Sequence, residues 1–249
     1  MCASQSGHPR VFISSTVHDF RDLRSGLKFW LEELGYEVML SEYNDFAKSF
    51  DSNSYDSCLR AIDDCGYFVL LIGARTGGIY DANKGVSITR MEYQHAYKRL
   101  TEGRLKLLVF VRKEIWDVRE DRKALERILR EDYQAELEMS DQQIASLVNH
   151  RSHAVNNPEA TFAFLEEVSR ANEMKKATAV GTNFPPGNWI HVFNTFEEIA
   201  IALKQALRIT GNLHRRALVL GVRQECIGNL RKLLLKRDND FSHFFSIPG

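Results

Sequence analysis

The sequence predicts an α/β protein in which a five-stranded parallel sheet is flanked by helices. Short apolar runs alternate with stretches in which apolar residues recur every three or four positions, a pattern typical of strand–helix–strand units. The run Tyr67–Ile72 is continuous and lies between Gly66 and Gly73, as expected for a central strand that is buried on both faces. The spacing between strands also leaves room for right-handed crossover helices.

The elements follow in order from the N-terminus. Arg10–Thr16 forms the first strand and its loop, and the helix after it carries an apolar stripe of Phe20, Leu23, Leu27, Leu31 and Leu34. Ser15 or Thr16 can cap this helix, and Gly35 can end it. The remaining expected elements are a strand at 36–40, a helix with Tyr55, Cys58, Leu59, Ile62 and Cys65, the strand 67–72, a loop at 73–85, a helix at 88–100 and a strand at 105–111.

The regular alternation then stops and later resumes. A charged helix is predicted over 117–139 and a second helix over 159–174, with Phe162, Leu165 and Val168 on one face. A fifth strand follows at 189–193, and Thr195-Phe196-Glu197-Glu198 predicts a capping box for a last core helix to about 209. We therefore expect a flexible N-terminus at 1–9, an α/β domain at 10–209 with a helical insertion at about 117–187, and a basic amphipathic helix and tail at 212–249.

Composition narrows the classes of function. Of 249 residues, 44% are hydrophobic and 27% are charged, which is typical of a globular protein. Basic and acidic residues number 33 each, so the chain has no overall field that would attract nucleic acid. The four cysteines (Cys2, Cys58, Cys65 and Cys226) show no metal-ligand spacing and are expected to be reduced, so no metal site is predicted. Without a signal peptide or an apolar run of membrane-spanning length, the sequence predicts a cytoplasmic protein.

The C-terminal segment leaves several interpretations open. Leu218, Val222, Ile227, Leu230 and Leu234 are expected inside, and seven basic residues against the single acid Glu225 are expected outside. The simplest interpretation is a helix that packs on the core. An oligomer contact, a membrane-surface helix, a connection to further domains and a nucleic-acid contact are the alternatives.

Topology points to one crevice as the ligand site. In an open parallel sheet, ligands bind beyond the carboxyl ends of the strands where the strand order reverses. For a flavodoxin-like order of 2-1-3-4-5, this crevice lies between strands one and three, and the N-terminal amides of the helix near Ile88 face it. The candidate binding residues are Ser14, Ser15 and Thr16 on one loop, and Gly73, Arg75, Thr76, Gly77 and Ser87 on the other. The glycines match no established phosphate-binding loop.

Glu92 is the candidate catalytic residue, and two interpretations of it are open. In the first, Thr89 and Glu92 form a capping box in which the carboxylate bonds back to the Thr89 amide. In the second, Glu92 faces the crevice and stabilises positive charge that develops on a sugar ring. The remaining candidates are expected to be structural: His18 on a helix surface, a solvated charged face of Asp19, Arg21, Asp22 and Arg24, and packing tryptophans at Trp30 and Trp189.

The same residues resemble a known family. Val11-Phe12-Ile13-Ser14-Ser15-Thr16, followed by Asp19, Arg24, Leu31 and Gly35-Tyr36, looks like the TIR-like domain-of-unknown-function family numbered four thousand and sixty-two. Further matches are Cys58, Ile62, Cys65, the strand 68–72 with Gly73, and Ser87-Ile88-Thr89 followed by Glu92-Tyr93 and Ala96. The resemblance covers residues 10–112 well and 189–207 more loosely. Arg75-Thr76-Gly77 departs from the Arg-Tyr-Gly that the family often has there.

This resemblance implies a place among TIR domains and nucleoside deoxyribosyltransferases. In their enzymatic members, a glutamate at the start of the third helix promotes cleavage of an N-glycosidic bond, commonly in NAD, and the matching residue is Glu92. The implied function is an immune effector in prokaryotic antiphage defence that hydrolyses NAD or a related nucleotide, with NAD as substrate and no cofactor. The alternative is a non-catalytic module that binds a nucleotide signal or a partner immune protein and drives oligomerisation.

Overall fold

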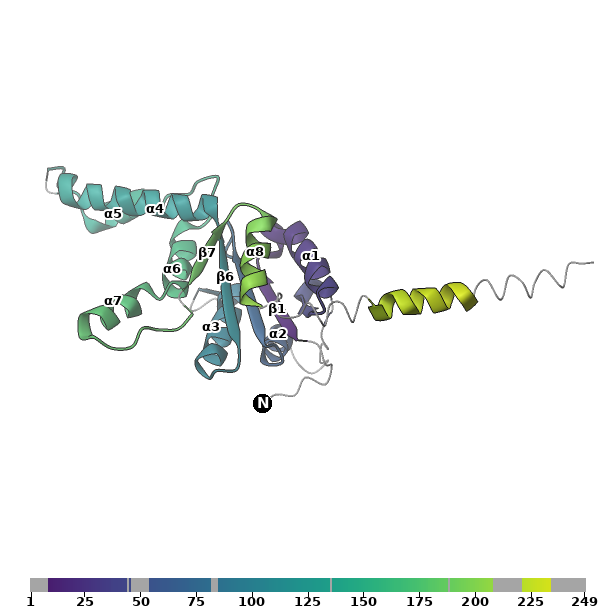
Figure 1. Ribbon diagram of the computed structural model, residues 1–249. Coiled ribbons are helices and arrows are strands. Elements are labelled where there is room, and N and C mark those ends of the chain that lie inside the picture. The colour runs from purple at the N-terminus through teal and green to yellow at the C-terminus, as the bar shows by residue number, and fades with distance from the viewer. Residues whose placement is uncertain are drawn as a thin grey trace, which may run out of the picture. The chain divides into compact units, whose positions relative to one another are not determined.

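The computed structural model describes residues 9–43, 45, 54–81, 85–134, 136–187, 189–207 and 221–233. The chain divides into two compact units, Met1–Ala202 and Leu203–Gly249. The first unit contains the sheet and most of the helices (Figure 1). In the second unit, residues 221–233 form a helix. Among the described helices, none is both long enough and apolar enough to cross a membrane.

The predicted sheet is confirmed, including its order. Its five strands run in the order β2-β1-β3-β6-β7, and each neighbouring pair is parallel. This order is the expected 2-1-3-4-5 once the short strands β4 and β5, which form a separate pair, are set aside. The strand bounds are β1 (Arg10–Ser15), β2 (Glu37–Met39), β3 (Tyr67–Ile72), β6 (Lys106–Arg112) and β7 (Ile190–Phe193).

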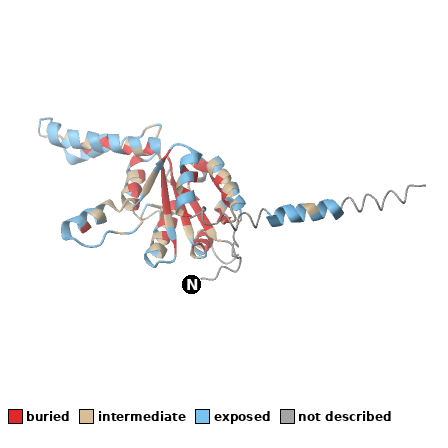
Figure 2. Ribbon diagram, viewed as in Figure 1, coloured by how far each residue is buried: buried red, intermediate tan, exposed pale blue. Residues whose placement is uncertain are grey.

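Helices cover both faces of this sheet, and the buried residues follow the strands between them (Figure 2). On one face, Phe12 and Phe68 stack across neighbouring strands and belong to the same core as buried residues of α2 (Ser54–Asp63) and α3 (Ile88–Thr101). On the other face, α1 (Val17–Glu33) meets the first residue of α8 (Phe196–Ala206) through an edge contact between Trp30 and Phe196. The packing role predicted for Trp30 is therefore confirmed.

Two predicted helix signals also hold. Gly35 follows the C-cap of α1 with a φ of 86°, the left-handed conformation that glycine adopts without steric cost. At α8, the Glu198 side chain accepts a hydrogen bond from the Thr195 amide at 3.1 Å, and the Thr195 hydroxyl accepts one from the Glu198 amide at 3.4 Å. These reciprocal bonds form the expected capping box.

The helical insertion differs from the prediction in its divisions. It consists of α4 (Lys113–Ile128), a π-helical turn η2 (Leu129–Tyr133), α5 (Asp141–Val148), α6 (Pro158–Val168) and α7 (Ala171–Val180). It begins at Lys113 rather than near 117, because β6 leads into α4 without an intervening loop. The predicted single helix over 159–174 is wrong: Arg170 has a φ of 53°, and this left-handed residue separates α6 from α7.

The predicted loop at 73–85 contains structure as well. Strand β4 (Ile79–Asp81) pairs antiparallel with β5 (Val86–Ser87). Gly77, before β4, and Gly85, directly before β5, have φ values of 81° and 62°, a left-handed conformation that glycine adopts without steric cost.

The prediction that Trp189 is a packing residue is wrong, because 76% of its surface is exposed. It lies just before the edge strand β7, which has a neighbouring strand on one side. Cys58, Cys65 and Cys226 are free thiols, with Cys58 and Cys65 buried, and Cys2 lies outside the described residues.

The predicted C-terminal helix is present at 221–233. Within its own unit, Val222, Ile227 and Leu230 of the predicted inner face are exposed. Leu218 and Leu234, predicted on the same face, lie outside the described residues.

Candidate functional site

A cavity of about 480 Å³ lies beyond the carboxyl ends of β1 and β3, where the topology predicted a crevice. The last two residues of β1, Ser14 and Ser15, and Thr16 after it contribute to its wall, and the loop after β3 contributes Arg75, Thr76 and Gly77. Helix α3 contributes Ile88, Thr89 and Glu92. The structure therefore brings together seven of the nine predicted site residues: Glu92 and these six residues from the end of β1 and from the segments that follow β1 and β3.

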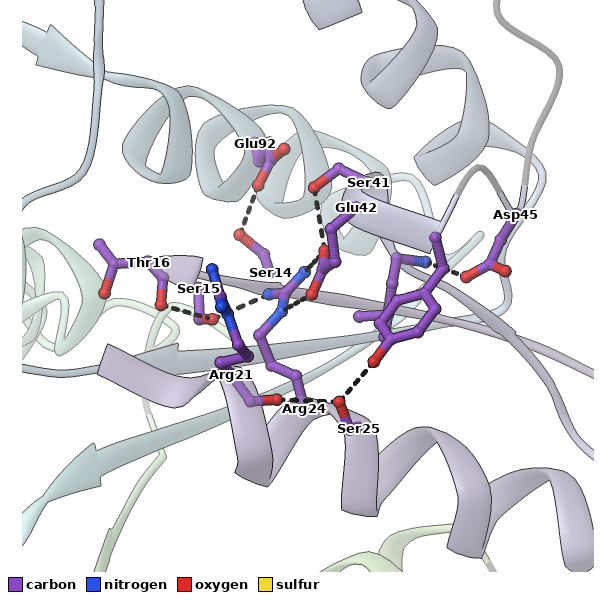
Figure 3. A network of polar contacts seen from close by, with 12 residues as sticks. Ser14, Ser15, Thr16, Arg21, Arg24, Ser25, Ser41, Glu42, Asp45 and Glu92 are labelled. Carbon is purple, nitrogen blue, oxygen red and sulfur yellow. Dashed lines mark hydrogen bonds and ion pairs between the residues drawn. The ribbon is translucent and has the colours of Figure 1, made fainter. Parts of the chain in front are cut away.

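Glu92 faces this cavity and not the start of its own helix. The Ser14 hydroxyl donates a hydrogen bond to Glu92 Oε2 at 2.5 Å, and both residues are buried (Figure 3). The cap of α3 is Ser87, whose hydroxyl accepts a hydrogen bond from the Arg90 amide at 3.2 Å. The Thr89–Glu92 capping box is therefore wrong, because the helix begins at Ile88 and its N-cap lies two residues before Thr89.

The surroundings of Glu92 bring its titration to neutral pH. Burial raises the pKa of Glu92 from 4.5 to about 7, because a carboxylate in a low-dielectric site loses its hydration. Hydrogen bonds from Ser14 and from the Cys58 thiol, and the positive charge of Arg24, act in the opposite direction but do not outweigh burial. Glu92 is thus close to half ionised near pH 7.

Arg24 contradicts the prediction of a solvated charged face. Its side chain is 2% exposed, and its Nε and Nη2 donate to the two carboxylate oxygens of Glu42, each at 2.6 Å (Figure 3). Nη1 donates to the Ser15 hydroxyl at 2.8 Å. The reason is positional, since Arg24 lies four residues after Phe20 and three before Leu27, on the apolar side of α1.

Arg24 also determines the ionisation state of Glu42. Burial acts to raise the pKa of Glu42, but hydrogen bonds and the positive charge from Arg24 outweigh it, so the pKa of Glu42 is lowered. Glu42 therefore stays ionised at neutral pH. It holds the guanidinium group of Arg24 beside the Ser15 hydroxyl.

Asp19 is also held inside, whereas Arg21 and Asp22 are exposed as predicted. Asp19 Oδ2 accepts hydrogen bonds from the Thr16 hydroxyl and from the Arg75 amide, both at 2.9 Å. This carboxylate therefore joins the loop after β1 to the loop after β3. His18 is exposed on the helix surface as expected, although it also lines the cavity.

Two predicted binding residues stand outside the cavity wall. Gly73 lies behind it, where a Cβ atom would come within 2.8 Å of Asp19 Oδ2 and of Phe20 Cε2. Ser87 is occupied as the cap of α3. Both shape the site, Gly73 by letting two segments approach closely and Ser87 by fixing where the helix of Glu92 begins.

The comparisons with known proteins place the chain in a family. The model described as "Domain of unknown function (DUF4062)" matches residues 10–208. The chain belongs to this family. The matched segment of this DUF4062 chain includes every residue that lines the cavity. No curated protein matches the chain, and no solved structure matches it.

The DUF4062 chain brings to the cavity several residues that were not predicted for the site, among them Ser41, Gly78 and Asn156. Asn156 comes from the segment between α5 and α6, and its backbone N–H donates a hydrogen bond to the Ala74 backbone carbonyl at 3.3 Å. The insertion thus contributes to the rim of the crevice beside Arg75. No periodicity or motif marks Asn156, so only the tertiary structure reveals it.

The cavity offers hydroxyl, amide, guanidinium and carboxylate groups for chemistry. Within the described residues, no group of three or more His, Cys, Asp or Glu side chains is placed to hold a metal ion. Glu92 is the single carboxylate in the cavity wall as described. The arrangement is able to bind an oxygen-rich ligand and to place one titrating carboxylate against it.

Proposed function

We propose that this domain cleaves the N-glycosidic bond of NAD or a related nucleotide, with Glu92 as the catalytic carboxylate. The observation that carries the proposal is the direction of the Glu92 side chain, which meets Ser14 in the wall of a 480 Å³ cavity. We further infer from the sequence resemblance that the domain is a TIR-like immune effector in prokaryotic antiphage defence, acting as an oligomer or with a partner immune protein.

The lining of the cavity supports a nucleotide ligand. Its volume lies within the range of about 300–1,000 Å³ that is usual for small-molecule sites. The hydroxyls of Ser14, Thr16 and Thr89 are suited to ribose oxygens. Arg75, whose side chain is 53% exposed at the rim, is suited to a phosphate group. In this pose the ribose lies against Glu92 and the phosphates lie toward solvent.

A single carboxylate suffices for this reaction. The nicotinamide nitrogen of NAD is cationic, so when the bond to the ribose breaks, nicotinamide leaves with the electron pair as a neutral molecule and needs no general acid. The ribose carbon becomes oxocarbenium-like, and ionised Glu92 stabilises that positive charge. Water then adds to the carbon and releases a proton, which gives ADP-ribose. The buried setting strengthens the stabilisation because few water dipoles screen it.

The ionisation of Glu92 predicts the pH dependence. Only the carboxylate form stabilises the cationic ribose, and the pKa of Glu92 is about 7. Turnover should therefore rise with pH through neutrality and level off about one pH unit above that pKa. A rate profile between pH 5.5 and pH 9 would measure this, and a flat profile would contradict the role of Glu92.

The direct test is nicotinamide release from NAD by concentrated protein, with fractions of each oligomeric state assayed separately. Glu92→Gln should reduce turnover by on the order of 10²–10³-fold, the usual cost of removing one electrostatic group from a transition state. Glu197→Gln, an exposed glutamate on α8, is the matched control and should leave turnover unchanged. Absence of turnover in every assembled form, or equal turnover by Glu92→Gln, would overturn the proposal.

A non-catalytic nucleotide-binding module is the second candidate. It is favoured by the raised pKa of Glu92, because burial makes the protonated form accessible near neutral pH, and a protonated carboxyl can donate a hydrogen bond to a ligand. In that case NAD mixed with the protein should be recovered intact after hours, bound in proportion to protein. Loss of self-association on deletion of 213–249 would add support. Release of nicotinamide would exclude this candidate.

A further inference from the structure

A second cavity, of about 420 Å³, lies within the helical insertion. It is lined by residues of α4, α5, α6 and α7 and by Asn149, which follows α5, and it shares none of its lining residues with the crevice. Four basic side chains contribute to its wall: Arg119, Arg122 and Lys123 from α4 and Lys175 from α7. A concentration of this kind in a nearly neutral chain calls for an explanation of how the charges are balanced.

The carboxylates around this cavity balance only part of the positive charge. Glu166 is shared, because it forms ion pairs with both Arg119 and Lys123. Glu126 pairs with Arg130, which is not part of the wall. Within the described residues, Arg122 and Lys175 have no carboxylate partner, and Glu159 is the one lining acid left to oppose them. Arg119 pairs with Glu120 as well. Arg122 and Lys175 are therefore the two lining cations that no carboxylate of the described residues contacts.

Arg122 is the most unusual of these residues. It is 7% exposed, and its guanidinium lies over the Phe162 ring at 5.5 Å. Its Nη1 and Nη2 donate to the carbonyls of Val148 and His150, at 2.8 and 2.7 Å. These carbonyls satisfy hydrogen bonds but carry only partial charge, and burial lowers the pKa of Arg122. A buried guanidinium without a full negative charge beside it is electrostatically costly.

Arg119 adds a second unsatisfied feature in the same wall. It is 5% exposed and lies over the Trp116 ring at 4.8 Å, and within the described residues its Nε atom has no hydrogen-bond partner. Buried polar atoms are normally paired. Two buried arginines thus lie one helical turn apart on α4. Arg119 is paired with Glu120 and Glu166 but keeps one unpaired donor, whereas Arg122 lacks a carboxylate partner among the described residues.

We propose that this cavity binds a small phosphate-bearing anion. A phosphate group accepts parallel hydrogen bonds from guanidinium groups and supplies a negative charge to Arg122 and Lys175, which have no carboxylate partner among the described residues. The volume admits more than an inorganic ion, and the Phe162 side chain gives the wall an apolar surface against which an organic part can pack. This site is separate from the crevice and does not depend on the function proposed for Glu92.

The structural alternative is that Arg122 only stabilises the end of α5. Val148 is the last residue of that helix, and a cation near a helix C-terminus is favourable by itself. That alternative predicts that Arg122 matters for stability but that added phosphate has no specific effect. The two explanations are therefore separable by ligand titration.

Inorganic pyrophosphate is the probe, titrated into the full chain by calorimetry and by thermal unfolding at constant ionic strength. It should bind the wild-type protein and raise the unfolding midpoint. Arg122→Gln should weaken binding by about tenfold or more, as expected for a charged hydrogen-bond donor, and Lys175→Gln by a smaller factor. Arg104→Gln removes an exposed arginine that lines neither cavity, so it is the matched control and should bind pyrophosphate as the wild type does. Arg75→Gln reports separately on any pyrophosphate that binds in the crevice.

Lys175→Gln keeps the test decisive if Arg122→Gln does not fold. Lys175 is exposed and forms no hydrogen bond to the described residues, so its replacement leaves the core intact. Weaker binding in Lys175→Gln with unchanged unfolding in buffer supports the site. Three results would each overturn the proposal: no binding of pyrophosphate by the wild type, wild-type affinity in both Arg122→Gln and Lys175→Gln, or a loss of binding confined to Arg75→Gln.

Discussion

Two arginine–carboxylate pairs of this protein show how differently the same interaction is used in two regions. Arg24 and Glu42 lie beside the crevice, with side chains 2% and 23% exposed. Arg130 and Asp141 lie in the insertion, with side chains 40% and 75% exposed, although the shortest contact in each pair is the same 2.6 Å. Distance alone therefore does not distinguish them.

The difference lies in what water does to each pair. Around Arg130, solvent screens the charges, and such surface pairs contribute little to stability. Around Arg24, the low dielectric strengthens every interaction, so its charge reaches Glu92 and influences the pKa there. The crevice concentrates charges in a buried setting where they act strongly on one another, whereas ion pairs of the insertion such as Lys113–Asp117 and Arg130–Asp141 are exposed and screened by solvent. Arg119 and Arg122 are the exceptions that led to the second proposed site.

The largest effect is expected from removal of the buried pair. Arg24→Met should destabilise the fold by about 3–5 kcal/mol, because it leaves Glu42 partly buried without its cation. Arg130→Met, the control in the insertion, should leave the unfolding midpoint unchanged. Urea unfolding of both variants gives the comparison. Equal costs would show that burial does not separate the two pairs.

The second effect is specific to Glu92 and depends on pH. Because its pKa is raised to about 7 in the folded protein, Glu92 opposes folding increasingly as pH rises from about 4.5 to about 7, and by a constant amount above that. Glu92→Gln removes this penalty, so its stability relative to wild type should grow by about 2–3 kcal/mol between pH 5 and pH 8. Denaturant unfolding at both values measures it. A difference independent of pH would contradict the shifted pKa.

A third, smaller effect concerns the close approach of two crevice segments. Gly73→Ala places a Cβ atom within 2.8 Å of Asp19 Oδ2 and Phe20 Cε2, and should cost roughly 2 kcal/mol through forced displacement. Gly66→Ala is the control, because no atom lies within 4 Å of the added Cβ there. If the two variants unfold at the same temperature, the packing around Gly73 is looser than described.

The smallest loss of stability is expected from removing one helix cap in each region. Ser87→Ala and Ser140→Ala remove the caps of α3 and α5, and each should cost about 1 kcal/mol. Only Ser87→Ala alters the first turn of the helix that carries Glu92, so it alone should weaken NAD binding or turnover. A matching loss of function in Ser140→Ala would contradict the separation of the two regions.

Much of the fold was predictable because local patterns and topology agree. The apolar runs that became β1, β3 and β6 are buried on both faces, and the strand order followed from the alternation of strands and helices. The crevice residues followed from the order, since a reversal between β1 and β3 brings their loops together. What the pattern could not give was the choice of cap at α3, because Ser87 and Thr89 are equally suitable by residue type.

The errors have physical causes at particular residues. Arg24 was placed in solvent on account of its charge, although its spacing from Phe20 and Leu27 already put it on the buried side of α1. Arg170 interrupts a helix by adopting a left-handed conformation that its residue type does not indicate. Asn156 reaches the crevice through the path of an entire insertion, and such long-range placement leaves no local trace in the sequence.

The backbone hydrogen bond between Asn156 and Ala74 joins two parts of the chain that the ribosome synthesises at different times. During synthesis from the N-terminus, β1, β3 and the helix of Glu92 emerge first, and the rim of the crevice stays incomplete until the end of α5 has followed. The edge strand β7 arrives later still and pairs with β6 across the whole insertion. Such non-local closures are slow steps in folding. The nascent chain therefore carries its carboxylate well before it carries a finished pocket.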